Sequence, residues 1–96
     1  MAVLIMFDGS THEVSPASPD SGFTAKEAAD LIGCSTIEHA WLADGRLMLM
    51  DEESKFRSDY IQRRNGRATT FYREAGSIPG DFVSGHALIC NSEEFR

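Results

Sequence analysis

The sequence has few cysteines, no long hydrophobic run and no excess of positive charge, and each shortage narrows what the chain can be. The two cysteines, Cys34 and Cys90, lack the CxxC spacing and the paired histidines of a zinc site. No apolar run approaches the roughly twenty residues that cross a bilayer, so no membrane span is expected. The formal net charge of −6 disfavours nucleic acid as a partner.

Recognisable catalytic motifs are also missing, since the chain has no P-loop, GxSxG elbow or HExxH segment. The histidines His12, His39 and His86 stand at spacings that require no metal. Ser84 and His86 would share one side of a strand, roughly 6–7 Å apart, too far for a nucleophile to bond to its base. We therefore expect neither an enzyme nor a cofactor.

The N-terminal third of the chain begins with a run of apolar strand formers, Ala2 to Phe7, which predicts a strand buried on both faces. This run is too short for a signal peptide and has no basic residues before it, so we expect a cytoplasmic protein. Thr11 to Val14 predicts a weaker return strand. Residues 15–22 contain two prolines and a glycine, which predicts a mobile surface loop.

Two short helices are predicted from their capping signals and apolar faces. Thr24-Ala25-Lys26-Glu27 has the form of a capping box, and Gly33 ends the same helix. In the second helix Asn65 is the predicted N-cap and Gly76 the residue after its end. Its core face is predicted to hold Ala68, Phe71, Tyr72 and Ala75, and its solvent side Arg67, Thr69, Thr70, Arg73 and Glu74.

Three further strands complete the predicted sheet. Thr36 to Leu42 and Arg46 to Met50 flank Asp44-Gly45, a strong signal for a hairpin turn. Phe82 to Cys90 is the last strand, with Gly85 at a bulge or a close backbone approach, and residues 91–96 form an acidic, frayed tail. Lys55 to Arg57 could add another short strand or simply lead into the second helix.

These elements predict a single α+β domain over residues 1–96. We expect a small mixed β-sheet of about four to five strands, with two helices packed on one face. Ala2–Phe7 or Phe82–Cys90 could then lie at an edge and pair with a second copy.

Charge is unevenly distributed along the chain. Residues 55–73 hold six basic residues and one acid, a local balance of +5, so the rest of the chain carries −11. Arg63, Arg64, Arg67 and Arg73 are the candidate binding residues for an anion or a partner. The first three lie at the start of the second helix, where free amides and the helix dipole favour anions. Alternatively, these arginines are only a solvated helix face.

Cys34 and Cys90 are best explained as small buried apolar residues that stay reduced in a cytosol. A disulfide between the end of the first helix and the last strand is the alternative in an oxidising compartment.

Three segments, LMLMDEESKF, NGRATTFYRE and GDFVSGHALIC, resemble a family of small domains of unknown function from phage, plasmid and other mobile-element genomes. The resemblance spans roughly residues 38–90, and Ser54 departs from it because the family usually has glycine there. It implies a mobile-element origin but no particular activity. The matching residues are Asp51, Glu52, Asn65, Ala68, Thr69, Val83, Gly85 and residues 87–89.

The sequence thus predicts a non-enzymatic accessory protein of phage or mobile-element type. Its first expected role is protein interaction, either as a homodimer or with a host protein. The alternative is binding of an anionic ligand, a phosphorylated small molecule or nucleic acid, by Arg63, Arg64 and Arg67.

Overall fold

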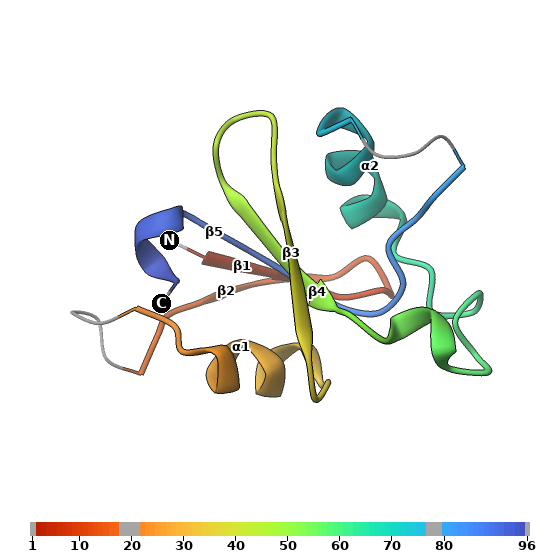
Figure 1. Cartoon of the computed structure of the whole chain (residues 1–96), viewed down its shortest axis with the longest axis horizontal. Helices are drawn as coiled ribbons and strands as arrows, with labels where there is room; N and C mark the ends of the chain where they lie inside the picture. Colours follow the sequence, from red (N-terminus) through yellow and green to blue (C-terminus); the bar gives the residue numbers. More distant parts are fainter. Residues whose placement is uncertain (1, 18–21, 77–79, 96) are drawn as a thin grey trace.

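The computed structural model describes residues 2–17, 22–76 and 80–95, and its centre is one antiparallel sheet of five strands (Figure 1). The strand order is β2-β1-β5-β4-β3. The strands are Ala2–Ile5 (β1), Thr11–Val14 (β2), Ile37–Trp41 (β3), Leu47–Asp51 (β4) and Ala87–Cys90 (β5). The helices are Ala25–Ile32 (α1) and Gly66–Glu74 (α2), with short 3-10 helices at Ser54–Phe56 (η1) and Ser92–Glu94 (η2).

The predicted α+β class and the number of strands are confirmed, but the expectation of a mixed sheet is wrong, because every strand pair is antiparallel. Two hairpins, β1–β2 and β3–β4, form the halves of the sheet, and β5 is inserted between them. The chain leaves the sheet at the end of β4, passes through α2 and returns as β5 from that same end of the sheet. β4 and β5 are therefore antiparallel, and no parallel crossover is needed.

The two helices lie on opposite faces of the sheet, and the prediction that both pack on one face is wrong (Figure 1). Successive residues of a strand point to opposite faces. In β4, Leu47 and Leu49 therefore join the core beneath α1, whereas Met48 and Met50 join the core beneath α2. The uninterrupted apolar run of β4 is typical of a strand covered on both sides.

The ends of both helices follow the sequence signals. Thr24 and Glu27 form the predicted capping box, with the Thr24 hydroxyl accepting from the Glu27 amide at 3.1 Å. The Asn65 side chain caps α2. Gly33 and Gly76 have φ angles of 84° and 90°, a left-handed conformation that glycine adopts without strain.

Two segments differ from the predicted layout. The last strand begins at Ala87 rather than at Phe82, because Gly85 has a φ of 85° that breaks the extended backbone. The tail predicted to fray contains η2 instead, and Phe95 forms a bridge to Phe23 and packs against the α1 core. Of the predicted loop 15–22, residues 18–21 lie outside the described part of the chain, and its mobility stays a prediction.

Cys90 is buried in the α1 core, as predicted, and Cys34 packs partly against the same core. Both thiols are free, and burial raises the pKa of each to about 11. Of the helices in the described ranges, none combines the length and apolar character needed to cross a membrane.

Candidate functional site

A buried hydrogen-bond network around Asn65 joins α2 to the sheet. The Asn65 side-chain oxygen accepts from the Ala68 amide at 3.0 Å, and this bond is the predicted cap. Its side-chain nitrogen donates to the carbonyls of Ile5 and Gly85, each at 2.9 Å. Asn65 is fully buried, so all of these bonds form away from water.

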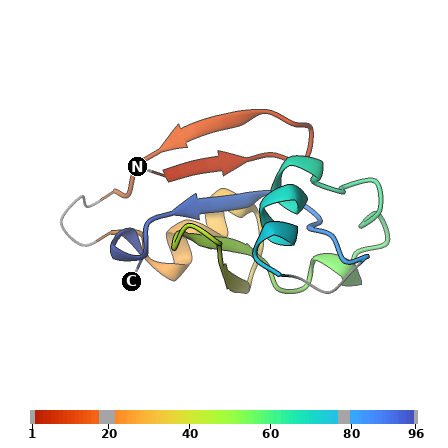
Figure 2. The same cartoon turned by 90° about the horizontal axis from the view of Figure 1, so that it is seen from above.

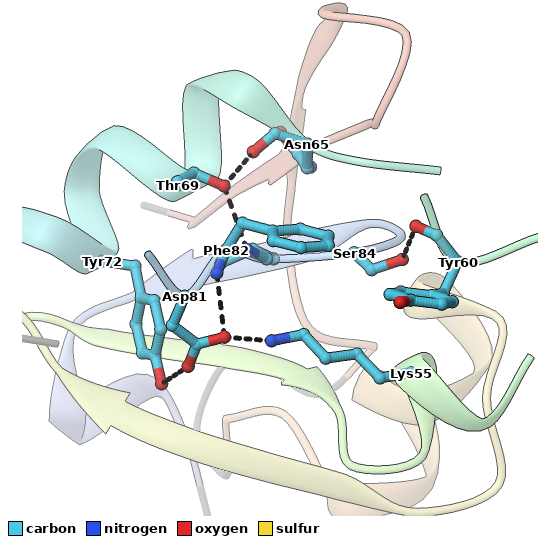
Figure 3. Close-up of polar contacts among 9 residues, drawn as sticks. Lys55, Tyr60, Asn65, Thr69, Tyr72, Asp81, Phe82 and Ser84 are labelled. Carbon is cyan, nitrogen blue, oxygen red and sulfur yellow. Dashed lines mark hydrogen bonds and ion pairs between the residues drawn. The ribbon is translucent and has the colours of Figure 1, made fainter. Parts of the chain in front are cut away.

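Thr69 belongs to this network, and its predicted place on the solvent side of α2 is wrong. The side chain is only 3% exposed. Its hydroxyl donates to the Asn65 carbonyl at 2.7 Å and accepts from the Val83 amide at 2.9 Å (Figure 3). The hydroxyl therefore links the first turn of α2 to the segment before β5, which periodicity alone could not indicate.

A polar cleft of about 90 Å³ lies beside this network. Asp81 lines the cleft and accepts hydrogen bonds from several of its neighbours (Figure 3). The Asp81 carboxylate accepts hydrogen bonds from Lys55, from the Phe82 amide at 2.9 Å and from the Tyr72 hydroxyl at 3.4 Å. The Lys55 bond is the main reason that the pKa of Asp81 lies below its ordinary value. Glu38 lines the same cleft, where burial and then Glu52 raise its pKa.

A carboxyl with a raised pKa beside one with a lowered pKa is a pattern found in acid–base catalysis. Here Asp81 already has three donors, and a cleft of about 90 Å³ has room for roughly three water molecules at about 30 Å³ each. The cation of Lys55 also lies 4.7 Å from the Phe82 ring, which stacks on Tyr60. These contacts serve to fix η1 and the following loop against α2.

The serine and histidine considered as a catalytic pair are both engaged with backbone groups. The Ser84 hydroxyl donates to the Tyr60 carbonyl at 2.7 Å. The His86 Nδ1 accepts from the Phe7 amide at 3.2 Å, and its ring stacks on the Phe7 ring at 5.1 Å between centroids. Burial, and then the charge of Arg63, lowers the pKa of His86. Both side chains thus support the backbone around β5.

The arginines proposed from sequence have different neighbours in the structure. Arg63 is half-buried, and its guanidinium lies 4.7 Å from the centre of the Phe7 ring. Arg64 is exposed, with its guanidinium 4.9 Å from the Phe82 ring. Such cation–aromatic contacts contribute to packing as well as to charge.

The other two arginines project from α2 itself. Arg67 is exposed in the first turn and lines a groove between α2 and the sheet. Arg73 is exposed in the last turn, where a cation is favoured by the helix dipole. Although Arg63, Arg64 and Arg67 are close in sequence, their side chains have different surroundings in the structure.

The groove beside Arg67 has a volume of about 330 Å³. It contains a second arginine, Arg46, from the turn between β3 and β4. Arg46 is not among the residues predicted from sequence, because that turn is distant from α2 along the chain. The residues that line the groove are Val3, Ile5, Thr11, Arg46, Arg67, Thr70, Phe71 and Ile89.

The edges of the sheet are β2 and β3, so the strands expected to pair with a second copy are the wrong ones. Residues 2–7 contribute β1, and residues 82–90 contribute β5, and each of these strands has a neighbour on both sides. On β3, Trp41 is 57% exposed although it is the largest apolar side chain in the protein. A free strand edge that carries an exposed apolar side chain can serve as a template for pairing with another chain.

In the part of the chain that the structure describes, no three His, Cys, Asp or Glu side chains come together as a metal site. Comparison of the chain with protein-family models, curated proteins and solved structures gives no match. The candidate sites therefore rest on the geometry of this chain alone.

Proposed function

We propose that the protein is a non-enzymatic interaction module that pairs with a second copy of itself through the free edge of β3. The observation that carries this proposal is the exposure of Trp41 on that edge. Phe56 and Ile61 are also exposed, but they lie outside the sheet and offer no strand edge.

The backbone of β3 has donors and acceptors available for another strand. The Leu42 amide donates to the Arg46 carbonyl at 2.8 Å, and the Glu52 amide donates to the Thr36 carbonyl at 3.1 Å. In an antiparallel pair, residues that face the neighbouring strand alternate with residues that face away. The backbone groups of Ile37, His39 and Trp41 therefore point away from β4.

One register suits a symmetric pair of β3 strands. With the two-fold axis at His39, Ile37 lies opposite Trp41 of the second copy, and Glu38 lies opposite Ala40. Ile37, His39 and Trp41, whose backbone groups point away from β4, then all face a residue of the second copy. The aromatic side chain of Trp41 meets the β-branched side chain of Ile37. Shifting the axis to Glu38 would instead place two carboxylates opposite each other, which is unfavourable.

The other edge strand, β2, is a poorer candidate. Thr11, His12 and Glu13 are exposed on it, and Pro16 follows shortly after the strand. Charged side chains and prolines are typical of edges that resist pairing. Glu38 and His39 of β3 match Glu13 and His12 in charge, so Pro16 and the lack of a counterpart to the exposed Trp41 are what disfavour β2.

Association through one short strand buries less surface than a standard interface, so we expect a dimer that depends on concentration. Sedimentation from micromolar to about 1 mM protein should show monomers converting to dimers. His39→Glu should abolish the dimer by placing like charges on the axis. His12→Glu, the matched change on β2, should leave it intact.

A wild-type protein that stays monomeric over this range contradicts the proposal. So does a His39→Glu variant that dimerises as well as wild type. A second readout is the fluorescence of Trp41, the single tryptophan, which should shift to shorter wavelength as the dimer forms and the ring leaves water.

A phage or mobile-element origin and a cytoplasmic location belong to the same proposal. The resemblance of residues 38–90 to the mobile-element family supports the first. The free thiols of Cys34 and Cys90 support the second, since a reducing compartment keeps thiols free.

A further inference from the structure

The groove between α2 and the sheet has an apolar floor. In Figure 2, α2 lies over only one end of the strands. Val3, Ile5 and Ile89 form the floor beside it, and Phe71 of α2 supplies a wall. Val3 and Phe71 are each partly exposed, so apolar surface remains open to a ligand. Concave sites of this kind, with few polar groups, are typical of small-molecule binding.

Two arginines stand at the rim of this floor. Arg46 is paired with Asp44 at 2.7 Å, and its guanidinium also lies 5.7 Å from the Phe71 ring. Arg67 makes no ion pair or side-chain hydrogen bond with any residue in the described ranges. Two arginines and Asp44 leave a local charge of +1, although the whole chain carries −6.

We infer that the groove binds a small monocarboxylate with an apolar chain. The chain lies on the exposed surface of Val3 and Phe71, above the buried Ile5 and Ile89. The carboxylate meets the guanidinium groups of Arg67 and Arg46. Guanidinium and carboxylate match in geometry and form charge-assisted hydrogen bonds. A local charge of +1 balances a monoanion, whereas a dianionic phosphate would remain half unbalanced.

The volume of the groove sets the size of the ligand. At about 30 Å³ for a water-sized group, 330 Å³ holds roughly ten non-hydrogen atoms. Octanoate has this size and is the probe of choice. Apart from Arg46, in the turn between β3 and β4, the site uses β1, β5 and α2, so it does not require pairing through the free edge of β3.

Titration calorimetry and amide chemical shifts of the full chain should detect octanoate binding, with shifts at Val3, Ile5, Phe71 and Ile89. Octanol, which keeps the chain and loses the charge, should bind about tenfold more weakly or worse. Arg67→Gln should weaken octanoate binding by a similar factor. Arg73→Gln, the matched change on the same helix away from the groove, should bind octanoate like wild type.

Several results would overturn the inference. They are equal affinity for octanol and octanoate, an Arg67→Gln variant that binds octanoate normally, and the absence of binding at millimolar octanoate. Octyl phosphate binding about tenfold more tightly than octanoate would contradict the charge match. Because Arg67 is exposed, its substitution should leave the unfolding curve in place, which separates lost binding from lost structure.

Discussion

The side-chain amide of Asn65 donates to the backbone carbonyl of Ile5 at 2.9 Å, across 60 positions of sequence. The same nitrogen donates to Gly85, and the side-chain oxygen accepts from Ala68. One buried amide thus connects β1, the segment before β5 and the first turn of α2. An ordinary helix cap would satisfy only the last of these.

We therefore expect Asn65→Ala to lower the free energy of unfolding by about 3–7 kcal/mol. The cap accounts for roughly 1 kcal/mol, and each buried carbonyl left without a donor adds about 1–3 kcal/mol. Thr24→Ala, which removes the cap of α1, should cost only about 1 kcal/mol. Urea unfolding of both variants measures the difference.

Asn65→Asp separates the two roles of this side chain. It keeps an oxygen that can accept from Ala68 but removes the donor to Ile5 and Gly85. We expect it to be as destabilising as the alanine variant, because a buried carboxylate facing two carbonyl oxygens offsets the cap that it keeps. If it is as stable as wild type, the two carbonyl bonds contribute nothing and the cap explains the whole effect.

Local structure could be predicted from sequence where the signal lies within a few residues. The Thr24–Glu27 capping box, the glycines after each helix and the Asp44-Gly45 turn are of this kind. The sides on which the helices pack could not be predicted in the same way. A strand such as β4, apolar from Leu47 to Met50, accepts a helix on either face, so its sequence does not show which helix lies on which side.

The candidate sites were harder to predict, because they depend on which segments the fold brings together. Nothing near Arg67 in sequence points to Arg46, and only the sheet places both at one groove. Trp41 was assigned to a strand, but its exposure depends on β3 being an edge. Binding surfaces of this type can be located only once the order of the strands in the sheet is known.

Several residues on which the proposed resemblance to a mobile-element family rests are structural. Asn65, Ala68 and Thr69 are buried at the junction of α2 with the sheet, and Gly85 accepts one of the Asn65 bonds. A sequence motif built from such buried residues indicates a fold. It therefore carries little information about a ligand or a reaction.

Truncating Phe71 should have a smaller effect than its place on the predicted core face indicates. The ring is half-buried at the wall of the groove, so we expect Phe71→Ala to cost about 2 kcal/mol, below the usual range for a fully buried ring. Leu88→Ala, at a fully buried position of β5, should cost about 3–5 kcal/mol. Denaturant unfolding that ranks the two variants in the opposite order would contradict this view of the groove.

Gly22 is expected to tolerate no side chain. Its φ is 73°, and a Cβ atom there would lie 2.5 Å from the carbonyl oxygen of Glu94. Gly22→Ala should therefore cost about 1 kcal/mol for the backbone and a further 1–3 kcal/mol for the clash. Gly9→Ala, with a φ of 96° and open space around it, should show only the first cost. Thermal unfolding of the pair tests whether the C-terminal segment is packed against residue 22 in solution.

The stability of the protein should depend on the protonation of His86. Its neutral Nδ1 accepts from the Phe7 amide at 3.2 Å, and protonation would remove this acceptor. Burial, followed by the charge of Arg63, lowers the pKa of His86 below 6.5, while Asp8 opposes this weakly. A base whose pKa is lowered in the folded state contributes stability above its unfolded pKa. That contribution is lost as the pH falls below 6.5 toward the folded pKa.

Urea unfolding between about pH 7.5 and pH 5.5 should therefore show wild type losing stability as the pH falls. The His86→Gln variant keeps a side chain that can accept a hydrogen bond but cannot titrate, so its loss over the same range should be smaller. The difference in unfolding free energy between the two proteins should shift in favour of the variant at the lower pH. Parallel curves for the two proteins would mean that the imidazole is as free to protonate in the folded protein as in the unfolded chain. The Phe7–His86 contact would then have no part in stabilising β5.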